Sequence, residues 1–532
     1  MIPELILVGC TPATDNDSDN PEAATAAPAE ARRSRVSALI MALAALPEGG
    51  DAGARMATVN ALREEAGGFL SMLTTAAHAK ELSSTDEARR AALRAQQLAL
   101  AVHQAGKVLA MDLSREAGRF LNRRPAIEAL SFALATGWEV LCTFTRTYTP
   151  LPKNFWLDCH RLFAYIDAQG WAGRTAGRRE DSLGTLYRRI MLLGMTGANR
   201  LEHAKIELLI GVVRDEAHRI ALARVDQPLD EGGAFVFRPD ADQPPRFVDA
   251  LPATDRPVVW WRADLERITQ ELPKRISALQ AAEVASAYEL QLLGLLLREW
   301  ASPPRRRHFR KYQREQIEVE VISQFGACWR ALHDSAELPP VEDWGVAIED
   351  DEDAAAHGEV PPPALLQVRN MSSSGLLLEG ESPTQPLRTG GLILFRRPGR
   401  AWMLGLIRWV SFSGESLASQ CGVEILGRVP QAALVMPVIS HPGGARYMRA
   451  LSLKRGRTLV LPGRFYQPFR EFLVADGRRL VGARATALVM QAAQYQVFNV
   501  KLGAEVAATA ELAAEAGQGA QDAARQGLRA TG

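Results

Sequence analysis

The chain changes character within the stretch PPRRRHFRKYQREQIEVEV, which runs from Pro303 to Val321. The two prolines disfavour a continuing helix, because proline lacks a backbone donor and clashes with the preceding turn. From Ile317 to Val321 apolar and charged residues alternate with a period of two, which is typical of a half-buried strand. The stretch therefore predicts that a β domain begins near residue 301.

The residues before this stretch carry helical periodicity. One apolar stripe recurs at every third or fourth position and comprises Leu98, Val102, Ala105, Leu109 and Leu113, and similar stripes surround Leu130 and Leu186. The segment 232–257 is rich in Pro, Asp and Gly and predicts a loop or a short hairpin, after which helices resume near Ala263. Residues 36–300 are therefore predicted to form a helical domain.

The residues after the stretch read as short strands separated by Gly, Pro and Ser. Such strands are expected from Val368 onward and over 391–395, 403–410 and 421–426, which predicts a small antiparallel β-barrel over 301–430. Residues 334–363 hold prolines and an acidic run, and they predict an exposed insertion in this barrel. Residues 440–502 continue the strand pattern around the turn Asp476-Gly477 and predict a second small β module.

The two ends of the chain are poor in large apolar side chains. Residues 1–35 therefore predict a disordered leader, and residues 503–532 a disordered Ala-rich tail. A length of 532 residues exceeds what one hydrophobic core supports. The expected fold class is α+β multidomain, with an N-terminal helical bundle, a small antiparallel β-barrel and a second small β module.

The composition indicates a soluble protein of a reducing compartment. The net charge of +1 gives no global field for nucleic acid or an anionic membrane, so any basic site must be local. No uninterrupted apolar run reaches the roughly 18 residues of a membrane helix. The cysteines are odd in number and far apart, which argues against disulfides and zinc: Cys10, Cys142, Cys159, Cys328 and Cys421. A cytoplasmic location is expected.

Two polar motifs flank the predicted strands of the barrel. The run Arg305-Arg306-Arg307-His308-Phe309-Arg310 precedes the first strand, and Asn370-Met371-Ser372-Ser373-Ser374-Gly375 ends a later one. A guanidinium fork pairs with the O6 and N7 acceptors of guanine, and it also binds phosphate. Asn and Ser side chains can bond guanine edges or brace a turn, and a glycine permits a positive φ or a close approach of ligand.

These motifs make residues 300–430 resemble a PilZ domain. The family's RxxxR motif corresponds to Arg306 and Arg310, and its (Asp/Asn)xSxxG motif to Asn370, Ser372 and Gly375. The resemblance implies a receptor for cyclic di-GMP, with ligand-binding residues Arg305, Arg306, Arg310, Asn370, Ser372 and Gly375 and with no other cofactor. About sixty residues separate the motifs, which is farther than the family's usual spacing, and the acidic insertion accounts for the difference.

Signals for an enzyme are weak. The tetrad Asp215-Glu216-Ala217-His218 lies in a helical pattern and has no phosphate loop to accompany it. No HExxH, GxSxG or spaced metal-binding motif occurs, so neither a catalytic residue nor a metal site is predicted.

The sequence is compatible with three functions. The leading prediction is a non-enzymatic bacterial effector in which cyclic di-GMP, bound at the hinge between the domains, alters the output of the helical domain. The resemblance implies an output to pilus, flagellar, adhesion or exopolysaccharide machinery. The second is a ligand-free PilZ-like scaffold for protein interaction. The third is a nucleic-acid binder using residues 305–314, which the near-neutral total charge disfavours.

Overall fold

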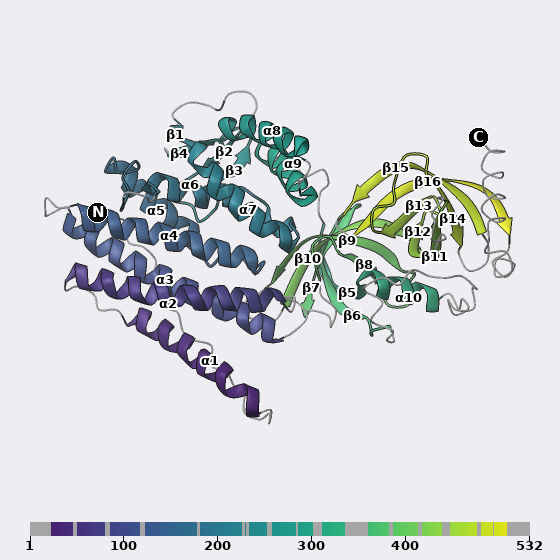
Figure 1. The fold of residues 1–532 in the computed structure, drawn as a ribbon, viewed down its shortest axis with the longest axis horizontal. Helices are drawn as coiled ribbons and strands as arrows, with labels where there is room; N and C mark the ends of the chain where they lie inside the picture. The colour runs from purple at the N-terminus through teal and green to yellow at the C-terminus, as the bar shows by residue number, and fades with distance from the viewer. Residues whose placement is uncertain are drawn as a thin grey trace. The chain divides into compact units, whose positions relative to one another are not determined.

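The computed structural model describes most of the helices and strands of the chain. The described residues are 23–45, 51–79, 86–117, 123–177, 181–225, 229, 233–252, 258–282, 286–301, 311–335, 360–381, 387–412, 418–438, 447–475, 480–492 and 494–507. The chain divides into two compact units, residues 1–307 with 411–417 and residues 308–410 with 418–532. The first unit is mainly helical, and the second holds two β-barrels (Figure 1).

The helical unit follows the predicted helical region. Its helices are α1 (Ala23–Ala44), α2 (Ala52–Ala79), α3 (Asp86–Ala117), α4 (Arg124–Arg146), α5 (Phe155–Ala168), α6 (Leu183–Gly194), α7 (His203–Glu216), α8 (Glu266–Ala281) and α9 (Ala287–Ala301), with short 3-10 helices η1 (Ala198–Arg200) and η2 (Ala217–Arg219). Helix α1 begins within residues 1–35, which had been predicted as a disordered leader. Residues 1–22 lie outside the described residues.

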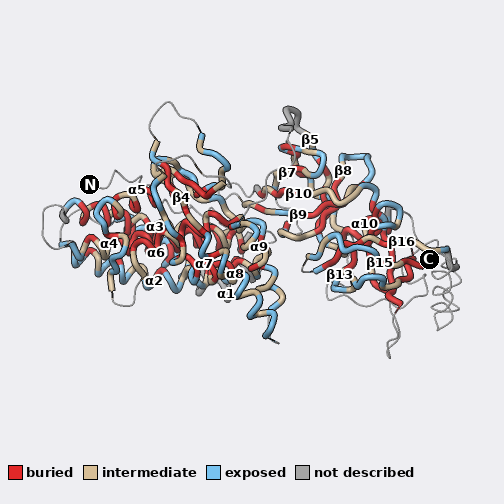
Figure 2. Tube along the Cα trace, turned by 90° about the horizontal axis from the view of Figure 1, so that it is seen from above, coloured by how far each residue is buried: buried red, intermediate tan, exposed pale blue. Residues whose placement is uncertain are grey.

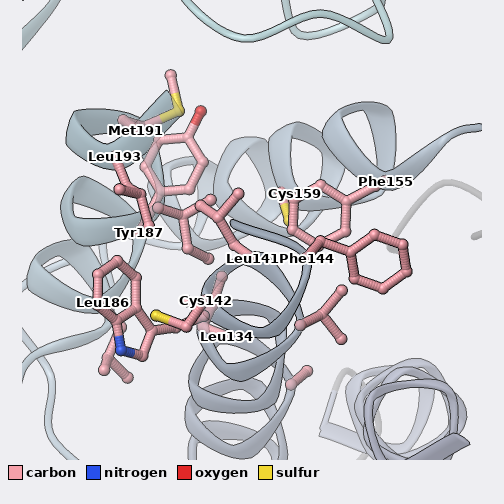
Figure 3. Packing of buried hydrophobic residues seen from close by; sticks show 14 of the residues in the cluster. Leu134, Leu141, Cys142, Phe144, Phe155, Cys159, Leu186, Tyr187, Met191 and Leu193 are labelled. Atoms are coloured by element: carbon pink, nitrogen blue, oxygen red, sulfur yellow. The ribbon is translucent and has the colours of Figure 1, made fainter. Parts of the chain in front are cut away.

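The predicted apolar stripe forms the buried face of α3. All five of its side chains are at most 4% exposed, and they belong to one core with α4 and α6. Figure 3 shows side chains of α4, α5 and α6 converging in this core, among them Leu134, Phe155 and Tyr187. Ser182 caps α6 because its hydroxyl accepts a hydrogen bond from the backbone N–H of Thr185 (3.2 Å).

Helix α4 is the most apolar long helix of this core. By length and composition alone it could cross a membrane, but 78% of its most apolar window is buried inside the folded unit. The burial of these residues is visible in Figure 2. Burial of this extent is expected for the core helix of a folded domain.

The helical unit also contains a small antiparallel sheet. Its strands are β1 (Ala221–Val225), β2 (Ala234–Phe237), β3 (Arg246–Val248) and β4 (Trp260–Asp264), in the order β1-β4-β2-β3. The hairpin β2–β3 lies in the segment where a loop or short hairpin was predicted. Strands β1 and β4 were not predicted, and helix resumes at Glu266 because β4 occupies the residues before it.

The second unit begins with a closed antiparallel barrel. Its strands are β5 (Lys311–Ser323), β6 (Ala364–Met371), β7 (Gly375–Glu381), β8 (Leu392–Arg396), β9 (Met403–Phe412) and β10 (Ala418–Arg428), in the closed order β10-β7-β6-β5-β8-β9. The prediction of a small antiparallel barrel is confirmed. Most of the predicted insertion, residues 336–359, lies outside the described residues.

A second closed antiparallel barrel follows, which confirms the predicted second β module. Its strands are β11 (Gln431–Pro437), β12 (Met448–Leu453), β13 (Thr458–Pro462), β14 (Glu471–Ala475), β15 (Leu480–Gln491) and β16 (Tyr495–Ala507), in the closed order β11-β12-β13-β16-β15-β14. Strand β16 extends into the tail that was predicted over 503–532. The predicted turn Asp476-Gly477 and the rest of that tail, from residue 508 onward, lie outside the described residues.

Helix α10 (Phe325–Ser335) joins the cores of the two barrels. Trp329 is 1% exposed and packs in one cluster with side chains of both barrels, including Leu394 and Leu434. Its indole Nε1 donates a hydrogen bond to the backbone oxygen of Ala433 (2.9 Å). The two barrels are therefore parts of one folded unit.

Candidate functional site

The pairing of β5 with β6 places the residue that follows the arginine run opposite the second sequence motif. In this antiparallel pair Lys311 lies opposite Met371, and Tyr312 lies opposite Asn370. Arg305, Arg306 and Arg310 lie outside the described residues. Arg310 is nevertheless joined by a peptide bond to Lys311, and consecutive Cα atoms are about 3.8 Å apart. The arginine run is therefore attached to the barrel beside the β6–β7 turn.

Ser372 closes the β6–β7 turn. Its backbone N–H donates to the carbonyl oxygen of Gly375 (2.7 Å). Its side-chain Oγ accepts from the N–H of Gly375 (3.2 Å) and donates to the carbonyl of the same residue (3.2 Å). The backbone N–H of Ser374 also points to Oγ (3.4 Å). The Ser372 hydroxyl therefore braces the turn, which is one of the two roles expected for it.

Gly375 is required by a close contact between strands. It is absent from the described residues with a positive φ, so a left-handed conformation is not the reason for a glycine here. A Cβ atom at this position would collide with the backbone oxygen of Val423 on β10. The collision arises because Gly375 lies opposite Glu424 in the β7–β10 pair. Of the two roles expected for this glycine, a positive φ is not observed, and the close packing of β10 accounts for the residue.

Asn370 lies inside the barrel end. It is 4% exposed, and a register shift in the β6–β7 pairing falls between Val368 and Asn370. Such an irregularity changes the direction in which side chains point at the end of a strand. A ligand would therefore have to gain access to this buried amide before it could bond to it.

The described arginines around the turn already have acidic partners. Arg369 on β6 pairs with Glu379 on β7, and Arg408 on β9 pairs with Glu424 on β10. Burial alone would raise the pKa of Glu379, but hydrogen bonds from Arg369 and Gln420 outweigh burial and hold this pKa below its usual value. Arg369 and Arg408 are therefore already neutralised by acidic partners on neighbouring strands.

The sequence reasoning missed Lys311 and Tyr312 as neighbours of the turn. Both are contiguous with the arginine run, so the strand could have been extended back from Ile317. The alternation of apolar and charged residues begins only at Ile317, and between Tyr312 and Ile317 the pairing with β6 shifts register. Because of this irregularity, the start of β5 at Lys311 was not predicted from the alternation.

The comparisons with known proteins point to one receptor. Residues 22–227 match the family model described as "Cyclic-di-GMP receptor FimW, N-terminal domain". The chain is also 23% identical over 399 residues to the cyclic-di-GMP receptor FimW of Pseudomonas aeruginosa, and the match covers 62% of this chain and 64% of that protein. The chain thus spans slightly less than two thirds of the relative's length.

The family match lies within the helical unit and covers α1 to β1. It does not extend to the first barrel, so the PilZ resemblance of residues 300–430 rests on the sequence motifs. Residues 22–227 of this chain are a distant match to the N-terminal domain family of the cyclic-di-GMP receptor FimW.

Proposed function

We propose that this chain is a non-enzymatic receptor for cyclic di-GMP and that its first barrel is a PilZ-like domain that binds the nucleotide at the β6–β7 turn. The observation that carries the proposal is the pairing of Lys311 with Met371, which joins the arginine run to the turn. The distant similarity to a cyclic-di-GMP receptor supports the same ligand.

The chemistry of the ligand fits the proposed residues. Cyclic di-GMP carries two guanines and two phosphates, and arginine can pair in bidentate fashion with either group. Arg306 and Arg310 supply these contacts in the proposal, with Arg305 as a further cation. Ser372 and Gly375 hold the turn in shape, as their hydrogen bonds and close packing support. Asn370 supports the turn and is available to guanine only after the turn opens.

Titration calorimetry with cyclic di-GMP tests the proposal. Arg306→Ala and Arg310→Ala are each expected to weaken binding about 5- to 150-fold, because a bidentate arginine–guanine contact is worth roughly 1 to 3 kcal/mol. The melting temperature should change little, since arginine side chains are mostly exposed in folded proteins. Arg464→Ala is the matched control, because Arg464 is an exposed arginine between β13 and β14 of the second barrel, whereas the β6–β7 turn belongs to the first barrel.

If the double variant Arg306→Ala/Arg310→Ala binds cyclic di-GMP with wild-type affinity, these arginines do not form the binding site. Absence of binding in the wild-type chain would favour the second function, a ligand-free scaffold. The bonded hydroxyl of Ser372 and the buried Asn370 are the observations that favour that alternative. Equal affinity for other polyanions, with a steep loss at high salt, would favour the third function, nucleic-acid binding.

The proposal includes a cytoplasmic location and a protein partner for the helical unit. The boundary between the two compact units falls between Arg307 and His308, within the arginine run. In the proposal, ligand that engages these arginines also restrains the connection between the units and changes the output of the helical unit. Pilus, flagellar, adhesion and exopolysaccharide machinery are the partner classes that the PilZ resemblance suggests.

A further inference from the structure

Three exposed turns of the second unit carry a concentration of positive charge. They are the β8–β9 turn (397–402), the end of β10 with the β10–β11 turn (428–430) and the β12–β13 turn (454–457). Their exposed cations are Arg397, Arg400, Arg428, Lys454, Arg455 and Arg457. None of these six forms an ion pair with a carboxylate of the described residues. In a chain of net charge +1, this is a strong local imbalance.

The fold brings these turns to one place. The backbone N–H of Val429 donates to the carbonyl oxygen of Trp402 (3.0 Å), which links the β10–β11 turn to the start of β9. Gln431 lies opposite Ser452 in the β11–β12 pair, so the β10–β11 turn and the β12–β13 turn lie at the same end of the second barrel. Gly427 also packs against the side chain of Leu453. We name the six cations with Val429 the basic end.

No acidic side chain interrupts the basic end. The segments 397–402, 426–431 and 452–458 are described throughout and contain neither Asp nor Glu. The neighbouring Glu320 and Glu424 are already paired, with Arg396 and Arg408 respectively. The six charges therefore add to one positive potential at this surface.

An exposed apolar side chain lies among the charges. Val429 is 62% exposed and has a φ of +52°, which is a genuine outlier for a β-branched residue. Lys454 (φ +52°) and Arg455 (φ +59°) are also left-handed. Strained backbone conformations are often found at functional sites. The strain at these three residues is therefore consistent with a functional role for this surface.

We infer that the basic end is a docking surface for a membrane that contains anionic phospholipids. Lysines and arginines near a bilayer surface are attracted to anionic headgroups, and an apolar side chain among them can enter the headgroup boundary. Single-stranded nucleic acid fits less well, because such sites stack bases on exposed aromatic rings. The one aromatic residue of the three segments, Trp402, is 7% exposed and covered by the guanidinium of Arg396 (4.0 Å).

Vesicle sedimentation of the full chain tests the inference. The chain should bind vesicles of phosphatidylglycerol mixed with phosphatidylcholine, and it should bind vesicles of phosphatidylcholine alone much less. The double variant Lys454→Asn/Arg455→Asn removes two charges while placing in each position a residue that tolerates left-handed φ, so folding should be kept. Each cation near an anionic surface changes partitioning about fivefold, so the double variant should bind about 25-fold more weakly.

Two further variants separate the explanations. Arg464→Asn is the matched control and should bind as the wild type does, because Arg464 follows β13, whose other end adjoins the basic end. Val429→Ser should weaken binding to vesicles without changing the charge. Equal partitioning of wild type and double variant would overturn the inference. Tighter binding to a DNA oligonucleotide than to vesicles, with Val429→Ser unaffected in both assays, would also overturn it in favour of a nucleic-acid site.

The inference is independent of the proposed nucleotide site. The double variant Lys454→Asn/Arg455→Asn should titrate with cyclic di-GMP as the wild type does, because its substitutions lie on the second barrel and the β6–β7 turn on the first. A loss of vesicle binding with retained nucleotide binding supports the inference. A parallel loss of both would assign the basic end to the nucleotide instead and overturn the membrane assignment.

Discussion

At the scale of single residues, the β6–β7 turn shows which residues of the Asn370–Gly375 motif stabilise the structure of the turn. Ser372 uses its hydroxyl to hold the turn, and Gly375 allows β10 to approach β7. Both roles are met without ligand. The same two residues therefore matter for the stability of the barrel as well as for the proposed site.

Gly375→Ala should destabilise the second unit by about 1 to 3 kcal/mol, because overpacking of this kind forces backbone shifts. The new methyl group would collide with the carbonyl oxygen of Val423. Urea unfolding of the full chain, followed by a signal from the β-barrels, measures the change. Gly326→Ala is the control in the same unit, since a Cβ there meets no atom within 4 Å. Replacing this helical glycine should raise stability by up to about 1 kcal/mol. Equal effects of the two substitutions would contradict the packing explanation.

The sequence was sufficient to find this turn but not to explain its glycine. The motif residues were placed correctly at a strand end, since Asn370 is the penultimate residue of β6 and Gly375 begins β7. The collision that demands glycine comes from Val423, which is distant in the sequence. No local pattern reports a contact of this kind. The arginines of the motif lie outside the described residues, so their role stays a prediction.

At the scale of elements, the β2–β3 loop is fastened to helix α5. The carboxylate of Asp242 accepts hydrogen bonds from the backbone N–H groups of Asn154 (2.6 Å) and Trp156 (3.1 Å) and so caps α5. His160 on α5 donates from Nε2 to the carbonyl oxygen of Gln243 (2.9 Å), so its Nδ1 accepts from the hydroxyl of Tyr187 (2.8 Å). The loop between two short strands thus completes a polar network around the buried His160 in the helical unit.

This network makes the stability of the helical unit depend on pH. Burial lowers the pKa of His160 from 6.5 to about 4, although Gln243 and Asp242 oppose the shift. A histidine with a lowered pKa stabilises the fold fully above its unfolded value, and this contribution is lost as pH falls from about 6.5 to about 4. The loss is on the order of 3 kcal/mol.

Unfolding free energies of wild type and His160→Gln, measured across this pH range, check the prediction. The variant should be less stable than the wild type at neutral pH, but its unfolding free energy should fall less as the pH is lowered. Buried His103, whose pKa is lowered to about 3, contributes to both proteins and cancels in the difference. His218→Gln is the control, because His218 is exposed in η2. A slope unchanged by His160→Gln would rule out this histidine as the source.

Helix α10 shows why some elements escaped prediction. Phe325, Cys328, Trp329 and Leu332 recur with helical spacing, so a signal was present. It covers only a short segment between a strand and an acidic, proline-rich run. Long apolar stripes such as that of α3 were predicted correctly because they repeat over several turns. Strands β1 and β4 are only five residues long and depend on pairing with each other, which periodicity does not reveal.

At the scale of the whole molecule, the unit boundary and the proposed ligand site coincide in the chain. The chain passes from the first unit to the second between Arg307 and His308, so the arginine run contains one of the connections between the units, and residues 411–417 provide the others. A ligand that contacts this run would therefore affect both units. Ligand shifts such an equilibrium only by its differential affinity for the two arrangements, and 1.4 kcal/mol is enough for a tenfold change.

We therefore expect saturating cyclic di-GMP to slow hydrogen exchange across residues 300–316 and to change the small-angle scattering profile of the full chain. Exchange slows because a segment that is held by ligand opens less often, and the profile changes if the units are restrained in a new arrangement. Arg306→Ala/Arg310→Ala is the matched control and should show neither change at the same nucleotide concentration. If the wild-type chain binds the nucleotide tightly while exchange over 300–316 and the profile both stay constant, the hinge mechanism is wrong. The receptor assignment would survive that result, because it rests on the affinity of the first barrel and not on the movement of the units.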